Sequence, residues 1–231
     1  MSERKLPARS TKGEVDAFLQ AAKKPPRQAA SGRLLFAMDA TASREPTWDQ
    51  ACKLQADMFS ATDEIGGLAV QLCYYRGYRE FEHSDWMMNA AGLARQMTGV
   101  RCLGGATQIL RVFTHAQNVA RQNRLNALVF VGDCMEEDID QVCNAAGQLS
   151  VFGVPAFMFQ EGNDPAASRT FSQVAQLTRG AHCHFNAGSA QQLRDLLRAV
   201  AVYASGGNDA LKRLAGASEV VRSLTRQLPG R

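Results

Sequence analysis

Five side chains that carry oxygen occur in three separate stretches of the chain, and together they have the composition of a cation site. Asp39, Thr41 and Ser43 alternate with alanines, Thr107 follows a pair of glycines, and Asp133 ends an apolar run. A hard divalent cation prefers oxygen ligands, and Mg²⁺ takes about six of them while keeping some waters. Two carboxylates and three hydroxyls therefore predict a site for Mg²⁺, or for Mn²⁺ or Ca²⁺.

Each of these residues also has an ordinary structural explanation. Ser and Asp in front of a helix are common N-caps, and Thr107 could cap the helix that follows it. Asp133 could be a turn residue, and the pattern D-x-T-x-S alone occurs by chance in many loops. The cation hypothesis therefore depends on whether three distant segments meet in space.

Apolar runs alternate with helical patterns from Gly32 onward. The runs at 34–38, 126–133, 153–160 and 181–185 predict strands, and 67–75 and 78–83 predict two strands joined at a tight turn. A helix is expected at 46–64, with Trp48, Cys52, Leu54, Met58 and Phe59 facing inward. Further helices are expected from Ser84 to Met97, from the end of the Gly-rich loop at 101–108 to about Gln122, and at 138–149, 165–178, 189–204 and 208–227. This alternation is typical of an α/β fold with a mostly parallel sheet, one antiparallel edge strand and helices on both faces.

The order of the strands explains why the oxygen-bearing residues belong together. In open parallel sheets, ligands bind beyond the carboxyl ends of the strands. Asp39 follows the first predicted strand and Asp133 ends a later one. We therefore expect the loops that carry them to converge on one edge of the sheet.

The combination of D-x-T-x-S, a distant Thr after a Gly-rich loop and a later Asp after a buried strand resembles the metal-ion-dependent adhesion site of von Willebrand factor A domains, of the bacterial intracellular type. The resemblance covers about residues 32–204 and implies their Rossmann-like fold. The family usually shows D-x-S-x-S, so Thr41 departs from it while keeping a hydroxyl. The resemblance implies that Thr41 and Ser43 contact the metal, that Asp39 and Asp133 act largely through water, and that Thr107 alternates between the two modes.

The same resemblance implies a protein-binding module and not an enzyme. An Asp or Glu carboxylate of a partner protein would replace a water on the ion, and a rearrangement of the loops could accompany this step. Two alternatives stay open. One is a Mg²⁺-dependent phosphohydrolase of the haloacid dehalogenase type, with Asp39 as nucleophile, although Thr41 stands where such enzymes have a second acid. The other is a scaffold that binds no metal.

Composition and charge set the broad class. The 231 residues are 45% hydrophobic and 21% charged, which is typical of a soluble globular protein. No apolar run has the roughly 20 residues of a membrane helix, and the N-terminus lacks a secretory signal. The six cysteines stand singly, without a C-x-x-C pair. We expect a cytoplasmic protein with reduced cysteines and no membrane contact.

The two ends differ from the body between them. Residues 1–30 have seven Lys or Arg against three acids, and 208–231 have five against two, so acids are in excess between these ends. We expect a basic, weakly ordered arm at 1–30, the domain at 31–205, and a basic helix or tail at 206–231. Because the basic surplus lies in the ends, no specific nucleic-acid binding is predicted. The sequence leaves the oligomeric state open.

Two further groups carry ligand atoms. The acids that follow Cys134 are expected to be solvated at a helix start or to hold a second cation. His182 and His184 share one face of a strand, but no third ligand accompanies them in the sequence.

Overall fold

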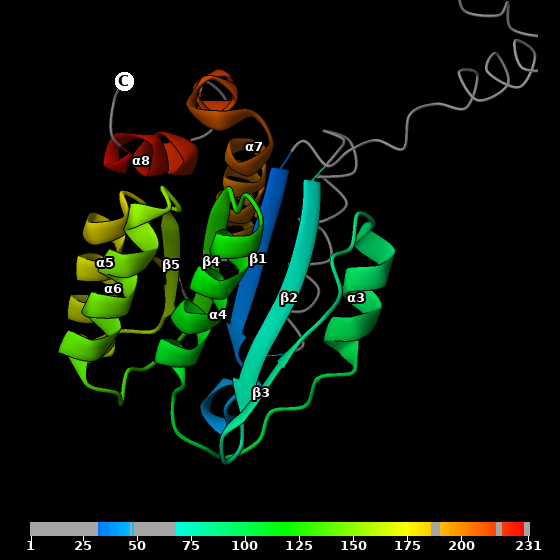
Figure 1. The fold of residues 1–231 in the computed structure, drawn as a ribbon, viewed down its shortest axis with the longest axis vertical. Helices are drawn as coiled ribbons and strands as arrows, with labels where there is room; N and C mark the ends of the chain where they lie inside the picture. Colours follow the sequence, from blue (N-terminus) through cyan, green and yellow to red (C-terminus); the bar gives the residue numbers. More distant parts are fainter. Residues whose placement is uncertain (1–31, 47, 49–67, 186–189, 216–218, 229–231) are drawn as a thin grey trace, which may run out of the picture.

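Continuous apolar segments of the sequence form the six strands of a single sheet in a computed structural model, which describes residues 32–46, 48, 68–185, 190–215 and 219–228. The strand order is β3-β2-β1-β4-β5-β6 (Figure 1). All neighbouring strands are parallel except β3, which pairs antiparallel with β2. The strands are β1 (Gly32–Asp39), β2 (Leu68–Arg76), β3 (Glu80–His83), β4 (Ala127–Gly132), β5 (Ala156–Glu161) and β6 (Ala181–Phe185). The predicted α/β class and its antiparallel edge are confirmed.

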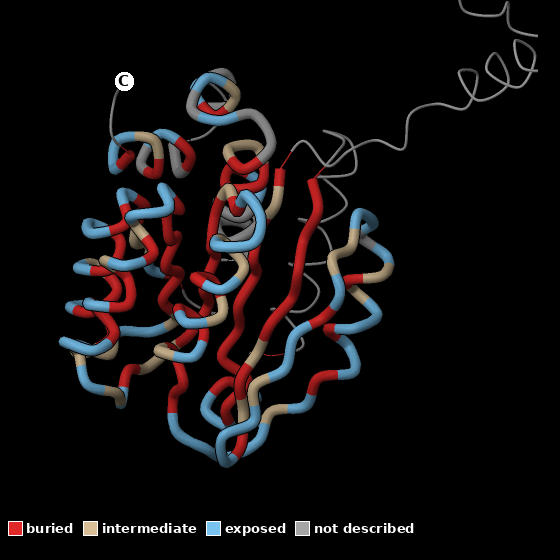
Figure 2. The backbone as a smooth tube through the Cα atoms, viewed as in Figure 1, coloured by how far each residue is buried: buried red, intermediate tan, exposed pale blue. Residues whose placement is uncertain are grey.

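Helices cover both faces of this sheet because alternate strand residues are apolar on both sides. The helices are α3 (Ala90–Thr98), α4 (Ile109–Gln122), α5 (Ile139–Val151), α6 (Pro165–Thr178), α7 (Ala190–Ala215) and α8 (Glu219–Gln227). From β1, Leu35 and Ala37 pack with α4, α5 and α6, whereas Leu34 and Phe36 pack with α3, α7 and α8. Figure 2 shows the central strands buried along most of their length and the outer sides of the helices exposed.

Capping residues explain where several predicted helices begin. The Asp138 side chain accepts a hydrogen bond from Gln141 N at the start of α5, and Asp164 accepts one from Ala167 N at the start of α6. Side-chain caps of this kind satisfy backbone N–H groups that have no partner within the helix. Farther along, Gly207 has a φ of 67° and interrupts α7. The helix predicted at 208–227 is therefore divided between the end of α7 and α8.

The prediction that Ser84 caps a helix is wrong. Ser84 N donates to Leu72 O (2.8 Å), and its Oγ accepts from Leu72 N (3.0 Å), so this residue extends the pairing of β3 with β2. The helix begins only at Ala90, where the Asn89 side chain accepts a hydrogen bond from Gly92 N (2.7 Å). A tertiary hydrogen bond thus replaces the local cap that the sequence suggested.

Most of the helix predicted at 46–64, with Cys52, Leu54, Met58 and Phe59, lies outside the described residues, as does the arm at 1–30. Trp48 faces inward as predicted, and its Nε1 donates a hydrogen bond to Val100 O (3.1 Å). Within the described ranges, no helix is long and apolar enough to span a bilayer.

The Gly-rich loop before α4 is fixed between the end of β1 and the turn that joins β2 to β3. Leu103 N donates to Ala40 O (3.1 Å), and Gly77 N donates to Leu103 O (3.4 Å). Gly105 lies so close to the turn that a Cβ atom there would be 2.1 Å from Gly77 O. A glycine is therefore required at position 105, whereas a Cβ at Gly104 would meet nothing within 4 Å.

These two neighbouring glycines give a matched prediction. Gly105→Ala should force the loop away from the turn and lower the free energy of unfolding by about 1–3 kcal/mol, as overpacking does. Gly104→Ala should leave the thermal midpoint nearly unchanged. Differential scanning calorimetry of both variants checks this, and equal midpoints would show that the loop is not held against the turn.

Candidate metal centre

Asp39 is a fully buried carboxylate at the carboxyl end of β1. Its Oδ1 accepts a hydrogen bond from Thr41 N (2.8 Å), and its Oδ2 accepts one from the Tyr75 hydroxyl (2.9 Å). Burial raises the pKa of Asp39 above its ordinary value of 3.8, the hydrogen bonds from Thr41 and Tyr75 oppose this rise, and the charge of Asp133 adds to it. Asp39 is thus held in one orientation at a cost in electrostatic free energy.

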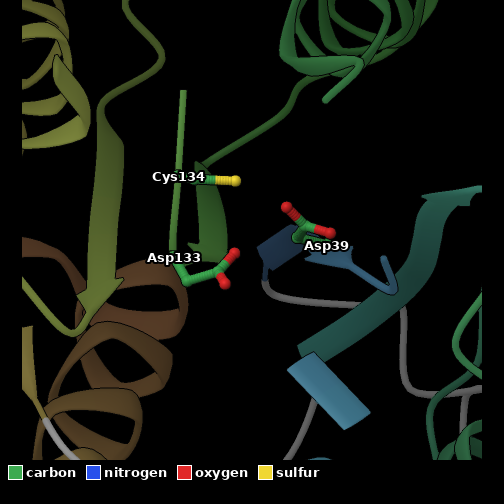
Figure 3. Close-up of side chains that lie close together, drawn as sticks. All are labelled: Asp39, Asp133 and Cys134. Atoms are coloured by element: carbon green, nitrogen blue, oxygen red, sulfur yellow. The ribbon is translucent and has the colours of Figure 1, made fainter. Parts of the chain in front are cut away.

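Asp133 lies opposite Asp39 because β4 pairs directly with β1, with Met38 beside Val131. One ligand atom from each of Asp39, Asp133 and Cys134 lies within 4.8 Å of the other two. Figure 3 shows the Asp133 carboxylate and the Cys134 sulfur on the side that faces Asp39. The structure therefore brings together two acids that are 94 positions apart in the sequence.

One oxygen of this cluster lacks a partner within the described structure. Asp133 Oδ1 is buried and has no hydrogen bond. Buried polar atoms are nearly always hydrogen-bonded, and an unsatisfied one costs free energy. A cation between the two carboxylates would satisfy this oxygen and offset their mutual repulsion.

Ser43 lies in the short 3-10 helix η1 (Ala42–Arg44), and Thr41 directly precedes this helix. Their hydroxyl oxygens are 3.1 Å apart. Thr41 precedes this helix, but its side chain makes no capping hydrogen bond. Thr41 is buried and Ser43 is exposed, so this pair extends from the Asp39 carboxylate to the surface.

Thr107 is buried and is bound to the loop that follows β4. Its Oγ accepts a hydrogen bond from Glu136 N (3.1 Å), while its own N donates to the Glu136 carboxylate (3.0 Å). Among the described residues, the hydrogen bonds of Thr107 go to Glu136 and not to Asp39, Thr41, Ser43 or Asp133. The reciprocal pair fixes Thr107 beside the loop that carries Asp133.

The acids after Cys134, Glu136 and Glu137, accept hydrogen bonds from backbone N–H groups at and just before the start of α4. The Glu137 carboxylate accepts hydrogen bonds from Ile109 N and from Leu110 N (3.0 Å), and so caps α4, whose own N-cap residue Gln108 makes no side-chain cap. The expectation that Thr107 caps this helix is therefore wrong. Glu136 and Glu137 together join the loop after β4 to the loop before α4.

Arg44 is one residue of this region that the sequence did not single out. It is completely buried and forms an ion pair with Glu161 at the end of β5. Burial lowers the pKa of Arg44 from its ordinary value, and the charges of Asp133 and then Asp39 oppose that change. The chain thus supplies one cation of its own beside the two carboxylates. The available signal was an Arg directly after the D-x-T-x-S motif.

Tyr75 was also missed, although β2 places it opposite Asp39 in the strand register. It is buried, and its hydroxyl donates to Asp39 Oδ2. In the sequence it is one of two adjacent tyrosines in an apolar strand, which gives no indication of a polar partner.

The donors present fit a divalent cation. Carboxylate and hydroxyl oxygens suit hard ions, and the buried Asp133 Oδ1 is in need of a partner. The His182 and His184 rings are 4.6 Å apart, but in the described part of the chain the only group of at least three His, Cys, Asp or Glu side chains that could hold a metal is Asp39, Asp133 and Cys134.

Comparison with known proteins identifies the fold. No protein-family model matches the chain, and no curated protein matches its sequence significantly. Among solved structures, a von Willebrand factor type A protein from Catenulispora acidiphila aligns over 76% of this chain with a TM-score of 0.62 and 14% identity. This chain covers only 43% of that protein.

Two isolated domains give the same result. The VWA domain of SpRpn10 aligns with a TM-score of 0.60 and 9% identity, covering 71% of this chain and 94% of that domain. The vWF domain of the type V pili tip protein Mfa5 from Porphyromonas gingivalis aligns with a TM-score of 0.55 and 10% identity, covering 74% and 95% respectively. At these identities the likeness establishes the fold alone: the chain has the von Willebrand factor A fold.

Proposed function

We propose that this chain is a protein-binding module that holds a divalent cation at the carboxyl edge of its sheet and uses it to bind an Asp or Glu carboxylate of a partner protein. The observation that carries the proposal is the pair of facing carboxylates, Asp39 and Asp133, with Asp133 Oδ1 buried and lacking a hydrogen bond to any described residue. The VWA fold of domains such as that of the pili tip protein supports the same role.

Each residue of the site has a distinct task in this proposal. Asp39 is fixed by Tyr75 and by Thr41 N, so it holds negative charge at a constant position. Thr41 and Ser43 present adjacent hydroxyls, and Ser43 reaches the surface. Oxygen donors of this kind favour Mg²⁺, and Mn²⁺ or Ca²⁺ as alternatives. The bound ion would supply an open coordination position for an incoming carboxylate.

The surface beside Ser43 suits a protein partner. Leu103 is 42% exposed in the Gly-rich loop, and Tyr78 is 85% exposed on the turn between β2 and β3. The hydrogen bond from Gly77 N to Leu103 O places the loop and the turn together. Exposed aromatic and aliphatic side chains near a polar centre are typical of contact residues at interfaces.

The phosphohydrolase alternative has less support from the geometry. A nucleophilic Asp must reach the phosphorus atom of its substrate. Asp39 is fully buried, and both of its carboxylate oxygens accept hydrogen bonds. The metal-free scaffold is the alternative that a metal titration decides.

We also propose a cytoplasmic location, the compartment expected for cysteines that stand singly in the sequence. Cys73, Cys102, Cys134, Cys143 and Cys183 form no disulfide with one another. Thiols persist in reducing compartments, where disulfides are rare.

Metal binding is the first prediction of this proposal. Isothermal titration calorimetry should show one Mg²⁺ or Mn²⁺ site in the wild type, and Asp39→Asn should weaken it by more than about 100-fold, beyond the loss expected for a residue that only supports a ligand. The matched control is Asp140→Asn, which removes an exposed acid from α5. A flat titration of the wild type would favour the scaffold.

The second prediction concerns stability without metal. The raised pKa of Asp39 means that the folded state binds this proton more tightly than the unfolded state, so ionised Asp39 destabilises the fold as the pH rises above about 4. Asp39→Asn should therefore have a higher thermal midpoint than the wild type at pH 7, by about 2–4 °C per kcal/mol of relief. This difference should shrink toward pH 4. A variant less stable than the wild type at every pH would contradict it.

The third prediction concerns the partner. Immobilised wild-type chain should capture a protein from its native cell in the presence of Mg²⁺ and release it on addition of EDTA. Asp39→Asn should fail to capture that protein, whereas Asp140→Asn should capture it. Mass spectrometry of the released fraction identifies it, and equal capture by wild type and Asp39→Asn in EDTA would overturn the proposed mode of binding.

A further inference from the structure

Cys134 stands apart from the other cysteines of the described chain. Cys73 and Cys143 belong to the core under α4, α5 and α6, and Cys102 and Cys183 pack against the core on the other face. Cys134 is part of neither core, although its neighbour Met135 is buried in one. A small apolar role in packing, the usual explanation for an unpaired cysteine, therefore does not account for Cys134.

The sulfur of Cys134 lies instead in the carboxylate cluster. It is within 4.8 Å of a ligand oxygen of both Asp39 and Asp133, and Figure 3 shows it pointing away from β4 toward the Asp39 side. The adjacent Asp133 Oδ1 is buried without a hydrogen bond. The unpaired oxygen points to a positively charged ligand, and the Cys134 side chain, which forms a hydrogen bond with Asp133, is close enough to contact the same ligand.

A donor set of two carboxylates and one thiolate selects among divalent ions. Zn²⁺ binds thiolate sulfur at about 2.3 Å and carboxylate oxygen at about 2.0–2.2 Å, and it commonly has three protein ligands with one position left open. Mg²⁺ and Ca²⁺ prefer oxygen ligands, and soft sulfur donors shift the preference toward Zn²⁺ and its chemical relatives. On binding, the thiol gives its proton to solvent.

We propose that Cys134 joins Asp39 and Asp133 as a protein ligand of the metal centre and gives this site a preference for Zn²⁺ over Mg²⁺. This inference rests on the proposed metal site and specifies its ion. Ser43 is exposed, so a partner carboxylate would approach the open position of the ion from this side.

Cobalt titration of the full reduced chain tests the sulfur ligand directly. Co²⁺ substitutes for Zn²⁺ in such sites, and a thiolate ligand gives a charge-transfer band in the near ultraviolet. The band should appear in the wild type and be absent in Cys134→Ser, which keeps the size of the side chain and an oxygen donor. Cys102→Ser is the matched control, because Cys102 is also half-buried and close enough to Asp39 to be influenced by its charge, but lies outside the cluster. His184→Ala controls for ions held by the histidine pair.

Competition measurements give the selectivity. The ratio of Zn²⁺ to Mg²⁺ affinity should fall by at least about 10-fold in Cys134→Ser and stay unchanged in Cys102→Ser. If Cys134→Ser fails to fold, as judged by circular dichroism, the wild type itself supplies the test. Zn²⁺ should then slow alkylation of Cys134, but not that of Cys102, as measured by peptide mass spectrometry.

The outcomes separate this inference from the proposed function. Binding that depends on Asp39, without a charge-transfer band and with an unchanged Zn²⁺ to Mg²⁺ ratio in Cys134→Ser, would overturn the role of Cys134 and leave the metal-binding module intact. Equal alkylation of Cys134 with and without Zn²⁺ would also overturn it. Absence of binding of Mg²⁺, Mn²⁺, Zn²⁺ and Co²⁺ to the wild type would overturn both.

Discussion

Two carboxylates that face each other at the end of adjacent parallel strands are the constraint on which the rest of this site depends. Asp39 is fully buried, and Asp133 is close enough to raise the pKa of Asp39. Two like charges in a region of low dielectric are unfavourable unless hydrogen bonds or a cation offset them. The Tyr75 hydroxyl and Thr41 N supply hydrogen bonds to Asp39, and buried Arg44 supplies a positive charge. Within the part of the chain that the structure describes, Asp133 Oδ1 has no hydrogen-bond partner, so this compensation is incomplete.

The surrounding loops are positioned by contacts that do not involve the proposed ion. Glu136 forms two hydrogen bonds with Thr107, and Glu137 caps α4, so the loop after β4 is joined to the loop before α4. Leu103 N joins the second of these loops to Ala40, beside Asp39. The Arg44–Glu161 ion pair extends the connections to β5. A site held this way is preorganised, which reduces the free energy spent on ordering it when a ligand binds.

Arg44 and the proposed ion are both cations near Asp39 and Asp133. The buried Arg44 guanidinium has a fixed position because it is paired with Glu161. Its positive charge partly offsets the charges of Asp39 and Asp133, so a divalent ion would meet a smaller net negative charge. We therefore expect this centre to bind cations less tightly than the two carboxylates alone would suggest. A thiolate from Cys134 would restore one negative charge.

The sequence predicted the parts that follow from pattern and topology. Continuous apolar runs located β1, β4 and β5, and the pairing of parallel strands then brought Asp39 and Asp133 to one edge. The contacts of Ser84 and Thr107 were not predictable, because local capping rules describe only neighbours in sequence, whereas their actual partners, Leu72 and Glu136, come from other elements. The hydroxyl of Tyr75 escaped notice for the same reason, since its role depends on strand register.

Crystallography with anomalous scattering tests the central claim most directly. Crystals of the full chain grown with Mn²⁺ or Zn²⁺ should give one strong anomalous peak bounded by the side chains of Asp39 and Asp133. The contrary result is a map with no peak at that position, with the carboxylates directed away from a common centre or with the Arg44 guanidinium occupying the space between them.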